Sequence, residues 1–471
     1  MKNKRVFCLM LCLILIVSAL LLPVCAEGNT QEDVSVSRGP HTLDGQVPVL
    51  GTGMLVSNTQ SALAYEVSSG TLLYAWNADA QMYPASMVKI MTALIAIEQG
   101  DLSDKVIANP GTLSSISSGA ITAGIQPGEI MSLENLLYCM LVYSANDAAA
   151  VIAEHIGGTQ EAFVEKMNSY ALQLGCTNTH FTNVHGLHDP EQLSTVRDIA
   201  RILEAALQHE EFQKIFTTSH YTVPATNMRD ERNLSTRNYL LNDDIVSTYY
   251  DSRVKGSRLG EDNNGLRSVA SYAESGNMQV ICIVAGTRSQ YLSDGYTVQT
   301  FGGFPETTEL LDQCFSGFSK RQIAFEGQAL RQNTVLNGDS DVFVAPDEPL
   351  ATVLPTGVTL SDLNFQYVDI AGSDQAPVEK GQQMALLQVW YGAVCVGQTY
   401  VHAMNDVPYA YVKTVMPQAL EQPVAWWVIL LIALGIFVLL AVVTLFIVRL
   451  MNKKRFMASK RRKAKRNRGE R

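Results

Sequence analysis

The feature that most constrains this chain is an uncharged run of 25 residues, 424–448. At about 1.5 Å per residue, such a run forms a helix of roughly 37 Å, which crosses a hydrocarbon core of about 30 Å with some tilt. Trp426 and Trp427 lie at its start, and twelve Lys and Arg residues follow within 449–471. Because basic segments stay in the cytoplasm, we expect a single-pass cell-membrane protein with a basic cytoplasmic tail and its main part outside.

The other end of the chain has the pattern of a secretory signal. Residues 1–26 combine a basic start with an apolar run, and they end on the small residue Ala26. This order is typical of a signal peptide that is cleaved on export. The alternative is an uncleaved membrane anchor. Residues 27–55 begin as a polar stretch rich in Gly, Ser and Pro, and we expect a linker there.

The net charge of the whole chain, −10, hides an uneven distribution. Residues 27–448 carry 44 acidic and 20 basic residues, a net charge of −24, whereas residues 449–471 carry +11. An acidic body argues against a nucleic-acid-binding domain, which presents a basic face on its folded part. We interpret the basic tail as a topology signal that also attracts anionic lipid, and we expect no nucleic-acid partner.

Cysteine usage adds little to this picture. Beyond the signal, five cysteines are scattered without C-x-x-C spacing, and most lie in apolar stretches. An odd count with no framework predicts buried free thiols instead of disulfides for these residues, which are Cys139, Cys176, Cys282, Cys314 and Cys395.

Periodicity divides the exterior part into two units. Residues 56–320 begin with a hairpin, continue with a block of helices and end with a central strand and a last helix, which predicts an α/β domain with an inserted helical region. The expected strands are 62–66, 71–76 and 277–286, and the expected helices are 86–99, 132–142, 147–155, 160–174, 195–209 and 307–318. Residues 321–415 show short alternating segments without a helical period, which predicts a small all-β domain.

Two short motifs carry chemistry. The first is Ser86-Met87-Val88-Lys89 at the start of an apolar helix. Residues three apart share a helix face, so the Ser86 hydroxyl and the Lys89 amine can meet. A serine becomes a good nucleophile when a base takes its proton, and a lysine serves as that base when burial or a neighbouring cation favours its neutral form. The competing interpretation is an N-capping serine with a solvated lysine.

The second motif is Ser144-Ala145-Asn146, 58 residues later and between two predicted helices. Ser144 could pass a proton between Lys89 and a leaving amine, and the Asn146 amide offers a donor and an acceptor to a peptide backbone. The competing interpretation is a helix cap at Ser144 or Asn146.

Together these motifs resemble those of the low-molecular-weight penicillin-binding proteins, which are serine D-alanyl-D-alanine carboxypeptidases. The resemblance runs from about residue 61 to residue 406 and includes the segments 73–77, 181–187, 194–198, 238–241 and 381–384. It implies a β-lactamase/transpeptidase-like fold with an antiparallel sheet. It also implies that Ser86 is the acylated nucleophile, Lys89 its base, and Ser144 and Asn146 the second catalytic element.

The third motif of that family, K-T-G on a strand beside the nucleophile, is altered here. Its nearest match is Lys255-Gly256-Ser257, followed by Arg258. By the resemblance, Lys255 would hold the substrate carboxylate, Ser257 would supply the missing hydroxyl, and Arg258 could add a second cation. The departure leaves two possibilities, a working carboxypeptidase or a protein that binds wall peptides and penicillin without turnover.

The resemblance implies a membrane-anchored extracytoplasmic serine peptidase. Its substrates would be peptidoglycan stem peptides ending in D-Ala-D-Ala, and β-lactams would acylate the same serine. No metal or cofactor is expected, because His185 and His188 form a lone H-x-x-H on a loop. A β-lactamase remains a further alternative, which would turn over bound penicillin rapidly.

Overall fold

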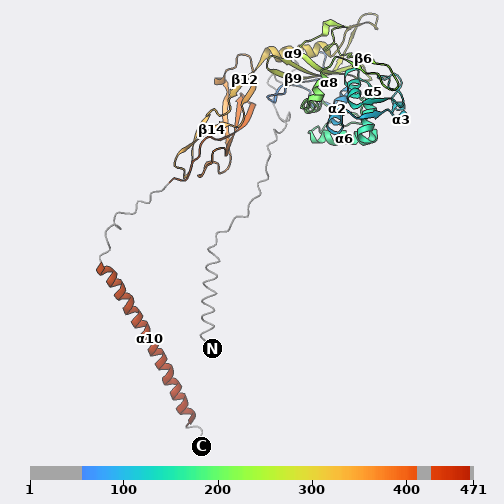
Figure 1. Ribbon diagram of the computed structural model, residues 1–471. Helices are drawn as coiled ribbons and strands as arrows, with labels where there is room; N and C mark the ends of the chain where they lie inside the picture. The colour runs from blue at the N-terminus through green and yellow to red at the C-terminus, as the bar shows by residue number, and fades with distance from the viewer. Residues whose placement is uncertain (1–55, 245, 411–425, 467–471) are drawn as a thin grey trace.

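The computed structural model describes residues 56–244, 246–410 and 426–466 (Figure 1). An α/β unit is followed by an all-β unit and by one long helix. The predicted signal peptide, the predicted linker 27–55 and residues 467–471 of the tail lie outside the described residues.

A five-stranded antiparallel sheet forms the centre of the α/β unit, in the order β2-β1-β9-β8-β7. Its strands are β1 (Ser61–Glu66), β2 (Thr71–Trp76), β7 (Val254–Glu261), β8 (Leu266–Ser275) and β9 (Met278–Arg288). The β9 strand is buried from Val280 to Ala285, as expected for a strand with neighbours on both edges and layers on both faces. The chain thus joins a hairpin near residue 70 to strands almost 200 residues later.

The helical block covers one face of this sheet. Its helices are α2 (Val88–Gln99), α3 (Pro110–Ser114), α4 (Leu133–Val142), α5 (Asn146–Gly157), α6 (Gln160–Gln173), α7 (Val196–Ala206) and α8 (Glu210–Phe216). The apolar α2 is buried from Val88 to Ala96, so it forms the centre of this layer. Two small hairpins accompany the helices, with strands β3 (Lys105–Ile107), β4 (Ile130–Ser132), β5 (His220–Val223) and β6 (Arg232–Ser235).

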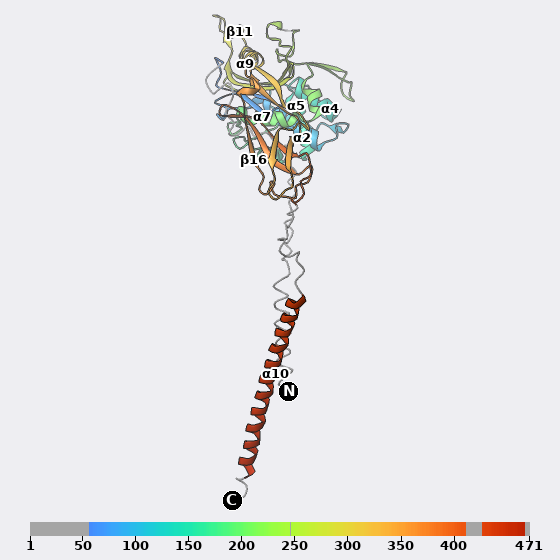
Figure 2. The same ribbon diagram turned by 90° about the vertical axis from the view of Figure 1, so that its left-hand side faces the viewer.

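The helix α9 (Phe304–Gly317) covers the opposite face of the sheet, so the unit has three layers (Figures 1 and 2). Phe304, Leu310 and Leu311 of α9 pack against Val280 and Val284 of β9. This helix begins one turn earlier than its predicted start at residue 307, because the Glu306 side chain accepts the Gly303 N–H at 2.7 Å and caps the helix. A two-stranded hairpin, β10 (Gln290–Tyr291) with β11 (Val298–Thr300), precedes it.

The all-β unit contains a five-stranded sheet in the order β13-β14-β18-β17-β16 and a two-stranded sheet of β12 and β15. The bounds are β12 (Phe318–Ala324), β13 (Arg331–Thr334), β14 (Asp341–Pro346), β15 (Leu350–Pro355), β16 (Asn364–Asp369), β17 (Gln383–Tyr391) and β18 (Val394–Ala403). Arg331 of the edge strand β13 contacts the other edge strand, β16. Its guanidinium carbon lies 4.9 Å from the centre of the Tyr367 ring, and its Nη1 lies 3.2 Å from Asp369 Oδ1. The sheet is therefore curled, and its own core contains Leu387, Val389 and Val401.

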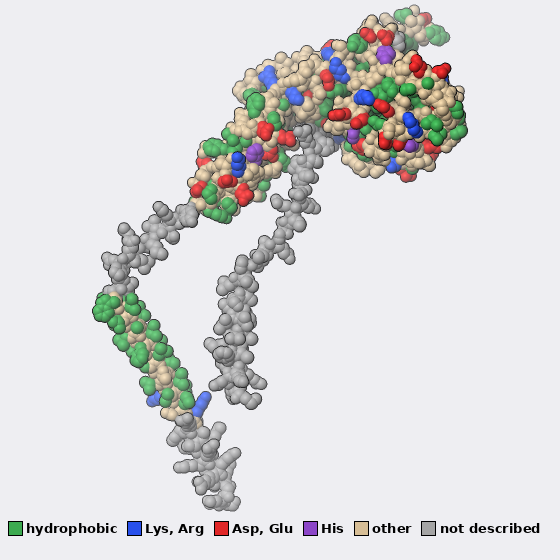
Figure 3. All heavy atoms as spheres, viewed as in Figure 1, with side chains coloured by type: hydrophobic (Ala, Val, Ile, Leu, Met, Phe, Trp, Pro, Cys, Tyr) green, Lys and Arg blue, Asp and Glu red, His purple; other side chains and the backbone are tan. Residues whose placement is uncertain are grey.

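The last helix, α10 (Trp426–Arg466), is long and apolar enough to cross a membrane. Its apolar part has a mean hydropathy of 3.2, and Figure 3 shows hydrophobic side chains along this part, with Lys or Arg where the coloured part ends. The side chains of this apolar part are not buried within the chain, unlike those of a core helix. A membrane anchor is compatible with these properties.

All five predicted free cysteines are indeed unpaired. Four of them are buried, and Cys395 is partly exposed. Burial raises the pKa of the Cys139 and Cys314 thiols to about 12, so both remain protonated and unreactive at neutral pH.

A half-buried acid, Glu204, joins α7 to the sheet and makes stability depend on pH. The Tyr65 hydroxyl donates to Glu204 at 2.8 Å, and burial raises the pKa of Glu204 from 4.5 to about 7. The folded chain therefore holds a proton that the unfolded chain releases between these values, so stability is lost as pH rises through 7.

We expect the free energy of unfolding to fall by about 2–3 kcal/mol between pH 4.5 and 8 from this group. Urea unfolding across this range measures the slope, and a Glu204→Gln variant with an unchanged slope would contradict the assignment.

Candidate active site

Ser86 lies in a short 3-10 turn, η1 (Ala85–Met87), that leads directly into α2. Backbone N–H groups in the first turn of a helix have no partner within that helix, and the dipole there favours negative charge. Ala85 adopts φ +45°, a left-handed conformation that is strained for a residue with a side chain. This strain at the turn is of the kind that accumulates at functional sites.

Lys89 lies one helical turn after Ser86 and is completely buried. Its Nζ is 3.2 Å from Ser86 Oγ, donates to Asn146 Oδ1 at 2.8 Å, and also donates to the His185 carbonyl oxygen. Burial, and next the positive charge of Arg258, hold the pKa of Lys89 well below its ordinary value, while Asp147 acts in the opposite direction. The amine is thus biased toward the neutral form that can accept a proton.

Ser144 lies in the short connection between α4 and α5, opposite Ser86. Its Oγ is 3.2 Å from Ser86 Oγ, and its backbone has φ +68°. Asn146 begins α5, and its Nδ2 donates to the Ile121 carbonyl at 3.0 Å while its Oδ1 accepts from Lys89. The predicted contact between Ser86 and Lys89 is therefore present, and the structure also brings Ser144 and Asn146 to this pair. Asn146 was expected to offer its amide to a peptide backbone, but both ends of that amide are hydrogen-bonded within the chain. The competing interpretation of a solvated lysine is wrong, because Lys89 is buried.

The loop at His185 closes the site from a third side, and its role was not predicted. The His185 carbonyl is the third acceptor around Lys89 Nζ. Gly186 has φ +85°, and a methyl group on it would lie 1.9 Å from the Ala85 carbonyl oxygen. Only glycine permits this approach of the loop to the nucleophile turn. Burial, and next the Lys89 charge, lower the pKa of His185 to about 4, so its ring stays neutral and Nδ1 accepts the Leu187 N–H at 3.2 Å.

The edge strand β7 forms the fourth side, and its even-numbered residues from 256 onward face the helical layer. A methyl group on Gly260 would lie 3.1 Å from the Ala85 Cβ and 3.4 Å from Ser86 N, so glycine lets the strand approach the nucleophile. Arg258 lies two residues earlier on the same face, is 4% exposed, and donates to the Leu141 carbonyl at the end of α4. Its Nε has no hydrogen-bond partner among the described residues.

Ser257 and Lys255 are not brought to Ser86, contrary to the sequence-based expectation. Side chains alternate between faces along a strand, and Ser257 points to the face of α9, where its Oγ lies 2.8 Å from Ser271 Oγ and accepts from Asn238 at 2.8 Å. Lys255 is exposed and donates to the Ser252 carbonyl at 2.8 Å. The residues beside the nucleophile are instead Arg258-Leu259-Gly260. Gly260 lies two residues after Arg258, as the glycine of K-T-G lies two residues after its lysine, so this match could have been recognised from the sequence.

The positive charge of Arg258 has a measurable consequence for the base. Burial lowers the pKa of Arg258 to about 10, so it remains charged at neutral pH and disfavours a second charge on Lys89. We expect Arg258→Met to shift the midpoint of the rising limb of the acylation pH profile upward, because loss of the positive charge raises the pKa of Lys89, and to slow acylation roughly tenfold at neutral pH. The measurement is the second-order rate constant for penicillin acylation from pH 5 to 10. An unshifted midpoint would show that Arg258 does not act on Lys89.

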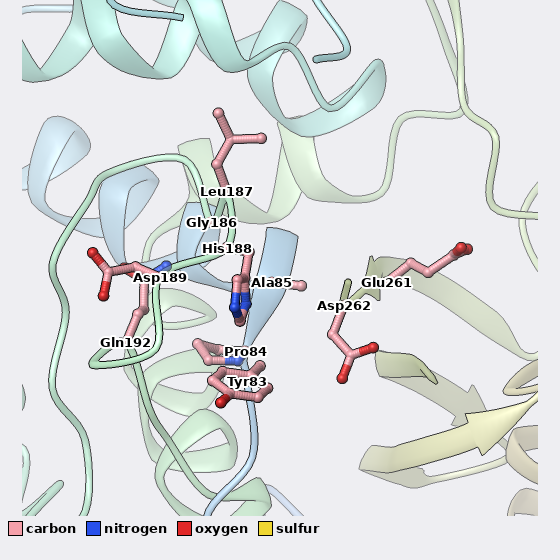
Figure 4. Close-up of a pocket in the computed structure, with 10 residues that line it drawn as sticks. All are labelled: Tyr83, Pro84, Ala85, Gly186, Leu187, His188, Asp189, Gln192, Glu261 and Asp262. Carbon is pink, nitrogen blue, oxygen red and sulfur yellow. The ribbon is translucent and has the colours of Figure 1, made fainter. Parts of the chain in front are cut away.

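The assembled groups can support nucleophilic catalysis with proton transfer. A hydroxyl, an amine whose pKa is lowered and a second hydroxyl form a chain within hydrogen-bond reach, and beside them lies Arg258, which has no carboxylate partner among the described residues. A small pocket adjoins Ala85 and is bordered by Tyr83, Gly186 and Asp262 (Figure 4). Within the described ranges, no group of three His, Cys, Asp or Glu side chains could hold a metal ion.

Comparisons with known proteins give one consistent result. Residues 54–289 match the model of the Peptidase S11 family, described as D-alanyl-D-alanine carboxypeptidase. The D-alanyl-D-alanine carboxypeptidase DacF of Bacillus subtilis is 27% identical over 362 residues, which cover 76% of this chain and 87% of that protein. The corresponding enzyme DacC of Escherichia coli is 30% identical over 358 residues, covering 73% of this chain and 82% of that protein.

Solved structures agree with these sequence matches. Penicillin binding protein 5 from Haemophilus influenzae superposes with a TM-score of 0.61 at 27% identity. The match covers 74% of this chain and 98% of that protein, so it includes both the α/β unit and the all-β unit.

Proposed function

Because this chain belongs to the Peptidase S11 family of D-alanyl-D-alanine carboxypeptidases, we propose that it removes the terminal D-alanine of peptidoglycan stem peptides through an acyl-enzyme on Ser86. The observation that carries the assignment of residues is the contact of buried Lys89 Nζ with Ser86 Oγ at 3.2 Å. An amine that is held neutral at this position is the base that a serine nucleophile needs.

Acylation follows from the geometry. Lys89 takes the Ser86 proton as Oγ attacks the carbonyl of the penultimate D-alanine. The Ser86 N–H in the first helical turn and a backbone N–H of β7 beside Gly260 stabilise the negative oxygen that forms. Arg258 attracts the terminal carboxylate of the peptide, because it is a buried cation on the site-facing side of β7 that lacks a carboxylate partner in the described residues.

Release of D-alanine requires a proton for the leaving amine. Ser144 Oγ lies 3.2 Å from Ser86 Oγ and can relay the proton taken by Lys89. Asn146 binds Lys89 through Oδ1 and so orients it. Water then hydrolyses the ester on Ser86 and regenerates the enzyme. A β-lactam would acylate the same serine as a substrate mimic.

The proposed placement is at the outer face of the cell membrane, with α10 as the anchor and the basic tail in the cytoplasm. In this arrangement residues 1–26 are the export signal, residues 56–320 the catalytic domain and residues 321–415 a spacer above the membrane. Substrate peptides and β-lactams are the partners, and the acidic body is consistent with the absence of nucleic-acid binding.

Mass spectrometry of the detergent-solubilised chain tests the function. With penicillin, we expect an adduct on the peptide that contains Ser86, and with a D-Ala-D-Ala peptide we expect released D-alanine. Ser86→Ala should show neither. An adduct that persists in Ser86→Ala would reject the nucleophile, and an adduct without D-alanine release would indicate binding without turnover. Rapid loss of the penicillin adduct would indicate a β-lactamase.

A further inference from the structure

The pocket next to the nucleophile has walls of unusual chemistry for a site that binds an anionic peptide. On one side, the rings of Tyr83 and His188 pack edge to face with centroids 4.8 Å apart. On the other side lies the end of β7, with Glu261 and Asp262. No Lys or Arg is among the ten residues that line this pocket (Figure 4).

The position of the pocket along β7 fixes which part of a substrate reaches it. Arg258 lies on one side of Ser86, and Asp262 lies four residues later on the other side. Four residues of a strand span roughly 13 Å. A peptide along β7 with its carboxylate at Arg258 and its penultimate carbonyl at Ser86 therefore directs its preceding residue toward Asp262.

Three carboxylates line the pocket, and they differ in their availability. Asp189 Oδ1 accepts the Glu191 N–H at 2.8 Å, and this side chain lies on the far side of His188 from Asp262 in Figure 4. Glu261 Oε2 lies 3.6 Å from Arg267 Nε, and its side chain extends away from the other lining residues in Figure 4. The Asp262 carboxylate lies across the gap from Tyr83 and His188. Its Oδ1 accepts the backbone N–H groups of Asn264 and Leu266 at 2.8 and 2.9 Å, whereas Oδ2 has one long contact at 3.4 Å, with Asn264 Nδ2. Oδ2 can therefore accept another donor.

We propose that this pocket takes the side chain of the residue that precedes D-Ala-D-Ala and selects one that ends in a protonated primary amine. An ammonium gains from a carboxylate and from nearby aromatic rings, and Asp262, Tyr83 and His188 all line the pocket. The site thus has a cationic end at Arg258 and an anionic end at Asp262, which match a peptide with a terminal carboxylate and a side-chain amine. The inference rests on the proposed function, since it uses the same substrate direction.

The test compares two peptides that differ only in the amine. They are acetyl-Lys-D-Ala-D-Ala, with a free side-chain amine, and its side-chain-acetylated counterpart. We expect the full chain in detergent at pH 7.5 to show a kcat/KM for D-alanine release about fivefold higher with the free amine, the effect of one partly exposed ion pair. Asp262→Asn should reduce this ratio to near one, because asparagine keeps an oxygen for the turn and loses the charge. Glu261→Gln is the matched control and should keep the ratio.

Two results would overturn the proposal: a wild-type ratio of one or less, or an Asp262→Asn ratio equal to that of the wild type. If neither peptide releases D-alanine, the proposed function fails, and acylation by penicillins still decides the pocket. Ampicillin carries a primary amine on its acyl side chain, and benzylpenicillin does not. A preference for ampicillin that is lost in Asp262→Asn supports the pocket, whereas equal ratios in both proteins reject it.

Discussion

Replacing Lys89 with methionine is expected to slow penicillin acylation of Ser86 by about a thousandfold or more, because the base is lost while the nucleophile remains. Methionine is similar in length and apolar, so it fits a site that is completely buried. The change leaves Asn146 Oδ1 and the His185 carbonyl without their donor, and we expect a loss of about 1–3 kcal/mol in the free energy of unfolding. Stopped-flow measurement of acylation and urea unfolding separate the two effects.

Lys166→Met is the control, because it makes the same substitution at a lysine outside the site. Lys166 is exposed on α6 and donates to Gln99 at 2.9 Å, far from Ser86 in the sequence and on the solvent side of its helix. It should acylate at the wild-type rate. If Lys89→Met acylates within tenfold of the wild type, another group takes the Ser86 proton and the proposed mechanism is wrong.

The second large effect is expected at Gly186, where a single methyl group should disrupt the site. Gly186→Ala forces φ +85° on a residue with a side chain and places the new Cβ 1.9 Å from the Ala85 carbonyl oxygen. The loop must move away, which carries the His185 carbonyl off Lys89. We expect acylation to fall at least about a hundredfold and the unfolding free energy to fall by roughly 3 kcal/mol or more.

Gly175→Ala is a matched control for the backbone strain alone. Gly175 has φ +76°, but no atom lies within 4 Å of an added methyl group. It should cost about 1–2 kcal/mol in stability and leave acylation unchanged. Equal acylation rates for the two variants would show that the contact between Gly186 and Ala85 does not hold the site together.

The comparison of sequence and structure is most informative at β7. The K-T-G expectation pointed to Lys255 because it is the only lysine in the segment 251–267. A sequence motif does not show which residues of a strand share a face. Side chains alternate between the two faces of β7, so Arg258 and Gly260 face Ser86 while Ser257 faces α9. The pairing register with β8 also shifts between Val254 and Gly256, so Lys255 has no partner residue on β8. Arg258, the cation beside Ser86, was part of the sequence-based prediction only as a second cation next to Lys255.

Local patterns were sufficient for most helices. The apolar run after Ser86 and the Gly residues near 157 and 175 placed α2, α5 and α6 within a few residues of their observed bounds. The short helices α3 and α8 and the hairpins β3–β4 and β5–β6 were missed, because elements of three to seven residues carry too little periodicity to stand out.

By itself, the sequence determined the separation of a folded body from an apolar helix, the α/β and all-β character of that body, and the pairing of Ser86 with Lys89. These depend on length, charge and spacing within one helix, which are local properties. The tertiary structure alone decided the burial that biases Lys89 toward its neutral form, the use of the His185 carbonyl, and the choice of Arg258 over Lys255. These features depend on burial and on contacts among residues 86, 144, 185 and 258, which are far apart in the sequence. No local sequence pattern contains such long-range contacts.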